Sequence, residues 1–127
     1  MDMPKQQQLP DAEFQIMKII WSNPTPITSV KVESFMKDSK AWHISTVQTL
    51  IRRLVTRGFL SVDKSKKERL YSPLVTYDEY LRVETEVFKE KFYKQSLSSL
   101  IRAMYADEKP SDEDIAEIEQ WFKGEAE

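Results

Sequence analysis

The sequence has no cysteine, and this absence excludes several kinds of site at once. Without thiols the chain cannot form disulfides, thiolate metal sites or a cysteine nucleophile. It has one histidine, His43, so no second imidazole can complete a transition-metal site. Its only glycines are Gly58 and Gly124, and it lacks glycine-rich phosphate loops and nucleophile elbows. We therefore expect no metal, no cofactor and no enzymatic activity.

Long hydrophobic runs are missing as well. No segment of about 18 apolar residues occurs, and the first residues lack the basic-then-apolar pattern of a signal peptide. Of the 127 residues, 40% are hydrophobic and 31% are charged, which is typical of a soluble globular protein. We expect a cytoplasmic protein with one domain of ordinary size, or a small domain with an extension.

Charge is unevenly distributed along the chain. The formal net charge is −2, but residues 1–73 carry 12 basic and 7 acidic side chains (+5), and residues 74–127 carry 7 and 14 (−7). Residues 40–73 alone carry eight basic and two acidic side chains, or +6. Such a concentration favours a phosphate-binding surface, where affinity comes from the release of condensed counterions. A solvated lysine-rich surface is the alternative.

The first part of the chain predicts an arm followed by two helices. Residues 1–10 are polar and glutamine-rich without periodicity, so we expect a flexible N-terminal arm. Apolar residues then recur with helical spacing over about 11–22 and about 28–37, the second helix being capped by Thr28. Val30 or Val32, with Phe35 and Met36, should face inward from that second helix.

A third helix is predicted over residues 41–58, with Gly58 as its stop. Its entry is ambiguous, because either His43 or Ser45 could cap it, the latter in a capping box with Gln48. The apolar residues on one face are Val47, Leu50, Ile51, Leu54 and Val55. The opposite face carries hydroxyls, an amide and guanidiniums, which can hydrogen-bond base edges and phosphates: Ser45, Gln48, Thr49, Arg52, Arg53 and Thr56. The hypothesis is a DNA recognition helix, although an exposed polar helix face is common in any protein.

Two short alternating segments, 59–62 and 69–73, flank a charged turn and predict a β-hairpin. Three helices followed by a hairpin over residues 11–74 are the order of a winged helix-turn-helix domain, whose third helix enters the major groove. The candidate DNA contacts of the hairpin, or wing, are Lys64, Lys66, Lys67 and Arg69. For any one of them, protection of the hairpin edge against aggregation is an equally good explanation.

Residues 75–127 predict three amphipathic helices, so the fold class is mainly α with a small β-hairpin. About fifty residues have too little interior to hide three apolar faces. We infer a C-terminal helical dimerisation domain, which a two-fold palindromic DNA site would require. The residues expected at its interface are Tyr77, Tyr80, Leu81, Phe88, Phe92, Leu97, Leu100, Ile101, Met104, Ile115, Ile118, Trp121 and Phe122.

Short motifs recur along the chain in a characteristic order and spacing. They are Asp11-Ala12-Glu13 with Met17 and Ile20-Trp21, Trp42 before Thr46-Val47-Gln48-Thr49 and Arg53-Leu54, then Arg57-Gly58, Tyr71-Ser72-Pro73, and Phe92-Tyr93 before Leu97. Together they resemble the BlaI/MecI family of penicillinase repressors over nearly the whole chain past the arm. The resemblance implies a homodimeric repressor that binds palindromic double-stranded operator DNA and controls β-lactam resistance or another stress response.

The resemblance also implies roles for individual residues. It assigns DNA contacts to Ser45, Thr46, Gln48, Thr49 and Arg53. Arg52 and Arg53 suit phosphates better than bases, and His43 suits a cap or a phosphate donor. In the antibiotic-resistance branch, a sensor-dependent protease cuts an Asn-Phe bond. Ala103-Met104 stands in that place here, a departure from the family pattern.

Copper sensing and protein binding are two alternatives to the operator-binding repressor. A related branch senses copper through C-terminal cysteines, which this chain lacks. A winged helix can also serve as a protein-interaction adaptor, because a fold does not determine a function. An adaptor would have no need to keep Arg52, Arg53 and the wing lysines uncovered.

Overall fold

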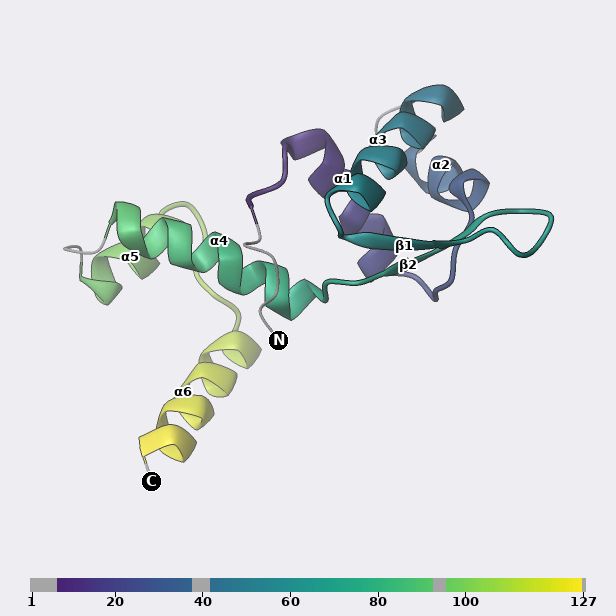
Figure 1. The fold of residues 1–127 in the computed structure, drawn as a ribbon. Helices are drawn as coiled ribbons and strands as arrows, with labels where there is room; N and C mark the ends of the chain where they lie inside the picture. Colours follow the sequence, from purple (N-terminus) through teal and green to yellow (C-terminus); the bar gives the residue numbers. More distant parts are fainter. Residues whose placement is uncertain (1–6, 38–41, 93–95, 127) are drawn as a thin grey trace. The chain divides into compact units, whose positions relative to one another are not determined.

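The computed structural model describes residues 7–37, 42–92 and 96–126. Within these ranges the chain forms six helices and one antiparallel hairpin, which confirms the expected mainly α class (Figure 1). It divides into two compact units, the first ending at Lys89 and the second beginning at Glu90. None of the helices in the described ranges has the length and hydrophobicity to span a membrane.

The first unit has the element order of a winged helix. The elements are α1 (Asp11–Trp21), α2 (Ser29–Lys37), α3 (Ile44–Thr56), β1 (Leu60–Asp63), β2 (Leu70–Pro73) and the larger part of α4 (Tyr77–Lys91). Leu60 pairs with Pro73 and Val62 with Tyr71 across the hairpin. Figure 1 shows the loop of this hairpin projecting beyond the helices.

An isolated β-bridge at Ile27, which the sequence did not predict, joins the hairpin to the segment that leads into α2. The Ile27 N–H donates to the Tyr71 carbonyl (2.9 Å), and the Tyr71 N–H donates to the Ile27 carbonyl (2.8 Å). One residue further on, the Thr28 hydroxyl accepts the Lys31 N–H (3.1 Å) and caps α2, as expected. The start of α2 is therefore fixed beside the base of the hairpin.

The structure confirms the expected stop of α3 and selects one of the two residues considered for its cap. At the C-terminus Gly58 has φ +84°, and the Gly58 and Phe59 N–H groups donate to the carbonyls of Val55 and Leu54. This is a Schellman motif, so Gly58 ends the helix as predicted. The helix begins at Ile44 with His43 in the cap position. Ser45 lies inside the first turn, so the capping box with Gln48 is not formed.

One hydrophobic core holds the first unit together. Burying each of its larger apolar side chains contributes roughly 1.5–3 kcal/mol. Val32 and Met36 of α2 face it as expected, whereas Val30 is 60% exposed and Phe35 is partly exposed. The core residues include Ile16, Met17, Ile20, Val47, Leu50, Ile51, Leu54, Phe59, Leu60 and Val75.

Two expectations about the edges of this unit need correction. The flexible arm was expected to include residues 1–10, but Leu9 is buried in the core. Residues 1–6 lie outside the described ranges. Tyr80, expected at a dimer interface, is also buried in this core among aromatic rings. For this reason the compact unit continues along α4 to Lys89, past the boundary expected between residues 74 and 75.

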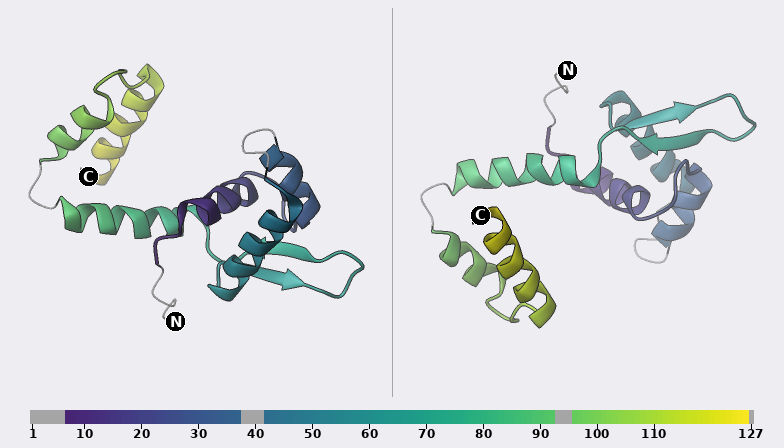
Figure 2. Two further views of the ribbon diagram at one scale, coloured as in Figure 1. Left: turned by 90° about the horizontal axis from the view of Figure 1, so that it is seen from above. Right: turned by 90° about the horizontal axis from the view of Figure 1, so that it is seen from below.

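The second unit contains α5 (Leu97–Met104) and α6 (Asp112–Ala126), joined by a short connection (Figure 2). The hydroxyls of Ser96 and Ser111 cap them, accepting N–H groups three residues further on (both 3.1 Å). The first turn of α6 is acidic, which suits the positive end of a helix. Among the side chains described in this unit, none is buried.

Candidate nucleic-acid interface

The outer face of α3 is polar and open. Thr49 is half-buried, its hydroxyl donating to the Ser45 carbonyl (3.0 Å) and accepting from Arg52 Nη2 (3.3 Å). The opposite face is fixed in the core by Val47, Leu50, Ile51 and Leu54. The helix therefore presents its polar side chains from a rigid support. The exposed residues at its start and along this face are His43, Ser45, Thr46, Gln48, Arg52, Arg53 and Thr56.

A cleft of about 330 Å³ lies where α3, the start of α2 and the hairpin meet. It brings Gln48 and Arg52 of the predicted recognition helix together with Arg69 of the predicted wing. The remaining lining residues are Thr28, Ser29, Glu68 and Tyr71. Sequence reasoning treated Thr28 only as a cap. The pairing of the preceding residue, Ile27, with the hairpin brings it to this cleft.

A second hollow, of about 430 Å³, borders the C-terminal half of the same helix. Thr49, Arg52, Arg53, Thr56 and Arg57 line it. Arg52 lines both hollows and is thus shared by the two groups of lining residues. His43, Ser45 and Thr46 belong to neither hollow and lie exposed at the start of α3.

The basic side chains predicted to contact DNA form no ion pair among the described residues. Within the described part of the chain, the ion pairs join Lys37 to Glu33, Arg57 to Glu13 and Lys89 to Glu86. None of them involves the predicted contact residues Arg52, Arg53, Lys64, Lys66, Lys67 and Arg69. A cluster of unpaired cations beside hollows attracts polyanions and releases their counterions.

The wing tip is shaped by a carboxylate that the sequence analysis did not single out. Asp63 Oδ1 accepts both the hydroxyl (2.6 Å) and the N–H (2.8 Å) of Ser65, closing an Asx-turn. These two hydrogen bonds, and the charge of Lys66, lower the pKa of the Asp63 carboxyl. Lys64, Lys66 and Lys67 are exposed on this ordered turn and do not line the cleft.

Arg57 differs from the other arginines because it is paired. Its Nε lies 2.6 Å from Oε1 of Glu13, and its Nη2 lies 3.4 Å from Oε2. The Glu13 side chain is only 2% exposed and that of Arg57 34%, so a partly buried pair joins the end of α3 to α1. Sequence reasoning missed the pair, although a signal existed: Glu13 lies three, four and seven residues before Ile16, Met17 and Ile20, within the apolar stripe of α1.

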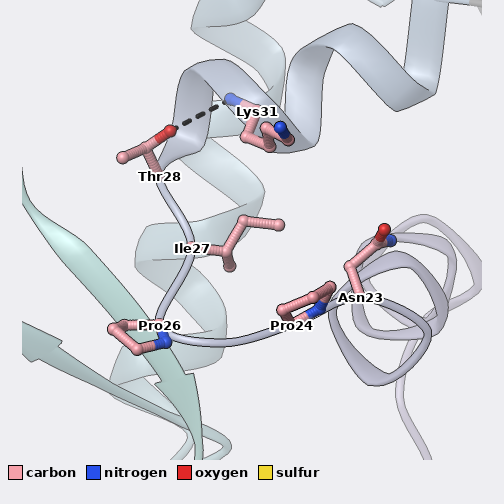
Figure 3. A pocket seen from close by; sticks show the side chains of 6 residues that line it. All are labelled: Asn23, Pro24, Pro26, Ile27, Thr28 and Lys31. Atoms are coloured by element: carbon pink, nitrogen blue, oxygen red, sulfur yellow. Dashed lines mark hydrogen bonds between the residues drawn. The ribbon is translucent and has the colours of Figure 1, made fainter.

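A further pocket, of about 290 Å³, lies between the end of α1 and the start of α2 (Figure 3). Asn23, Pro24, Pro26, Ile27, Thr28 and Lys31 line it. Lys31 is the only ionisable side chain among these lining residues, so they offer no acid–base pair for catalysis. Among the described residues, no group of three or more metal-ligating side chains occurs.

The residues expected at a dimer interface are mostly exposed within the single chain. Leu100 is partly buried, and Tyr80 belongs to the core of the first unit. Ala103 and Met104 lie in the last turn of α5, with Met104 72% exposed. The exposed set is Tyr77, Leu81, Phe88, Phe92, Leu97, Ile101, Met104, Ile115, Ile118, Trp121 and Phe122.

Comparison with protein families gives a match along almost the whole chain. The model of the family described as penicillinase repressor matches residues 9–123. The penicillinase repressor of Bacillus licheniformis is 30% identical over 118 residues, which cover 93% of this chain and 91% of the relative. The methicillin resistance regulatory protein MecI of Staphylococcus aureus is 29% identical over 114 residues, covering 90% and 92%.

Two solved structures resemble part of the chain. The solution structure of the DNA-binding domain of the repressor BlaI matches with a TM-score of 0.51 and 30% identity, covering 57% of this chain and 88% of that domain. The solution structure of monomeric Bacillus licheniformis BlaI in complex with the blaP half-operator matches with a TM-score of 0.50 and 30% identity, covering 58% and 89%.

Proposed function

Because this chain belongs to the penicillinase repressor family, we propose that it is a homodimeric transcriptional repressor that binds an inverted-repeat DNA operator through its winged helix. The observation that carries this proposal is the exposed, unpaired basic surface that α3 and the hairpin form around the cleft. The family is one of repressors, which are not enzymes. Such a protein works in the cytoplasm, where the operator lies.

The contacts divide by chemistry. Gln48 can hydrogen-bond an adenine through its side-chain amide and read a base pair in the major groove. Arg52, Arg53 and Arg69 suit phosphates, which receive half or more of the hydrogen bonds in protein–DNA complexes. The wing lysines, exposed at the hairpin tip, add charge beside the backbone. The remaining contacts of the recognition helix are His43, Ser45, Thr46 and Thr49.

Dimerisation follows from the apolar faces of the second unit. In this chain alone, Leu97, Ile118 and Trp121 are each at least 43% exposed. Water-exposed apolar surface on this scale marks an interaction site in a soluble protein. A second copy of the chain is the partner that a two-fold operator requires.

The resemblance also implies release from DNA by a sensor-dependent protease. The corresponding bond, Ala103–Met104, lies at the end of α5. A peptide bond in a helix is protected by its hydrogen bonds, and terminal turns open most easily. We propose that cleavage here requires the last turn of α5 to unwind first.

Operator binding is tested by selecting fragments of the host genome with the full chain, followed by gel-shift assays at physiological salt. Selected fragments should contain an inverted repeat. Gln48→Ala should reduce discrimination at one base pair by about tenfold or more, and Gln120→Ala, at an exposed position of α6, serves as the matched control. Equal affinity for all duplexes would overturn the repressor proposal and favour the adaptor.

Dimerisation is tested separately by sedimentation. Leu97→Asp places a charge on the exposed apolar face without disturbing a buried residue, so the folded chain should become monomeric. Ser98→Asp, at the neighbouring exposed position of the same helix, should leave the dimer intact. A monomeric wild-type protein at micromolar concentration would contradict the proposal.

A further inference from the structure

The helix α4 starts inside the core of the DNA-binding unit. The Tyr80 ring is buried, and its centroid lies 5.8 Å from that of Phe14 and 5.7 Å from those of Trp21 and Phe59. Just before the helix, the Val75 carbonyl accepts a hydrogen bond from Trp21 Nε1 (2.9 Å). The first turns of α4 are therefore fixed to α1 and to the end of α3.

A second set of contacts comes from the segment that precedes α1. The Leu9 N–H donates to the Tyr80 hydroxyl (2.6 Å), and that hydroxyl donates to Glu84 Oε2 (2.5 Å). The Gln8 side-chain amide donates to Glu84 Oε1 (2.7 Å). We call Gln8, Leu9, Tyr80 and Glu84 the N-terminal clamp. Because Tyr80 and Glu84 are four residues apart, the clamp holds two successive turns of α4.

Beyond the clamp, α4 continues as one helix to Lys91 and carries the exposed side chain of Phe88. Phe88 is one of the residues expected at the dimer interface. The direction of α4 relative to the recognition helix therefore affects where a second copy is carried. At 15 residues α4 is about 22 Å long, so a tilt of about 10° at its start moves its far end by about 4 Å.

A movement of that size matters for DNA recognition, because successive base pairs are about 3.4 Å apart along the duplex. We propose that Tyr80 and Glu84 are positioning residues that set the separation of the two recognition helices, and hence the number of base pairs between half-sites that the dimer accepts. This inference rests on the proposed function of the chain as a dimeric operator-binding protein.

The test uses the full chain and synthetic duplexes. An operator is first selected by the wild-type protein from random-sequence DNA. Affinities are then measured for that operator, for versions with one or two base pairs inserted or removed between half-sites, and for a single half-site. The wild type should bind the original spacing roughly tenfold more tightly than the altered ones.

Tyr80→Phe keeps the ring in the core and removes only the hydroxyl of the clamp. Its preference for the original spacing should fall to about threefold or less, with half-site affinity unchanged. Tyr105→Phe, which removes a hydroxyl at the end of α5, is the matched control. Glu84→Ala removes the shared acceptor without touching the aromatic core and should act in the same way, with Glu86→Ala as its control.

The possible results separate the two proposals. A wild-type protein that binds no duplex selectively, or that ignores spacing, overturns both the dimeric repressor and the clamp. A spacing-selective wild type whose Tyr80→Phe and Glu84→Ala variants keep that selectivity overturns the clamp alone. Equal losses of half-site and full-operator affinity also overturn it, because the clamp would then support the recognition helix rather than the spacing.

Discussion

The two compact units of this chain differ in how far their apolar side chains are buried. In the first unit Ile16, Val47 and Leu54 have no exposed surface, and the polar face of α3 points outward. In the second unit Ile118, Trp121 and Phe122 are between 43% and 58% exposed. A unit with a buried apolar core of its own can fold alone, whereas a unit without one gains stability when a partner covers its apolar surface.

This difference assigns a separate task to each unit. The first supports the proposed DNA-binding surface, and its stability should not depend on protein concentration. In the proposed dimer the second unit gains its stability from assembly, so its stability and dimerisation are linked by mass action. Charge follows the same division: residues 1–89 carry 14 basic and 11 acidic side chains (+3), and residues 90–127 carry 5 and 10 (−5).

The same substitution in each unit should therefore have different consequences. Ile51→Ala, at a position that is 1% exposed, should lower the free energy of unfolding by about 3 kcal/mol at any protein concentration. Ile118→Ala, at a position that is 43% exposed, should instead weaken the dimer. Urea unfolding at two concentrations roughly a hundredfold apart measures both. If Ile118→Ala lowered the free energy of unfolding equally at both protein concentrations, the two units would not differ in how they are stabilised.

The interior of the first unit also contains a charge, and removing its partner should have the next largest effect. Arg57→Ala leaves the buried Glu13 carboxylate unpaired. Because Arg57 is about one-third exposed, we expect a loss of about 2–3 kcal/mol, less than for a fully buried pair. Arg53→Ala, at an exposed position of the same helix, should change stability by less than about 0.5 kcal/mol. Equal losses for the two variants would refute the role of the pair.

Local sequence patterns predicted some features of the fold, and contacts between distant residues escaped them. Local signals were sufficient for the helix stop at Gly58, the cap at Thr28 and the apolar face of α3, because each depends on residues within a few positions. The pairing of Ile27 with Tyr71 and the ion pair of Glu13 with Arg57 join residues 44 apart in the chain, and no local pattern specifies such partners.

Tyr80 shows how far periodicity can mislead. It lies on the same amphipathic helix as Leu81 and Phe88, and spacing alone placed all of them at one interface. The structure buries Tyr80 against Phe14, Trp21 and Phe59, which come from two other parts of the chain. Similarly, the polar sequence of residues 7–10 indicates an arm, whereas the burial of Leu9 depends on a pocket that only the folded unit creates.

The DNA-binding surface of the first unit provides a smaller effect. Lys66→Ala removes one exposed positive charge at the wing tip, so affinity for all DNA sequences should fall alike, by several-fold. The slope of log affinity against log salt should become shallower by about 0.9. Lys109→Ala, an exposed lysine of the acidic second unit, is the control and should leave the slope unchanged. A change in base preference for Lys66→Ala would contradict a pure phosphate contact.

The smallest effect at neutral pH concerns the Tyr80 hydroxyl, whose titration reports how closed the first unit is. Burial, followed by the hydrogen bond to the Glu84 carboxylate, raises the pKa of Tyr80 from 10.0 to about 12. The folded state thus retains this proton between about pH 10 and 12, where the unfolded chain releases it. The resulting stabilisation is complete below about pH 10 and is lost as the pH rises towards 12.

Absorbance titration checks this. Of the five tyrosines, one should show tyrosinate absorbance only near pH 12, and Tyr80→Phe should remove that titration step. The difference in unfolding free energy between wild type and Tyr80→Phe should narrow over the same range. If the titration step that Tyr80→Phe removes lay near pH 10 instead, the Tyr80 hydroxyl would be exposed to water. The buried core of the first unit would then not include the start of α4.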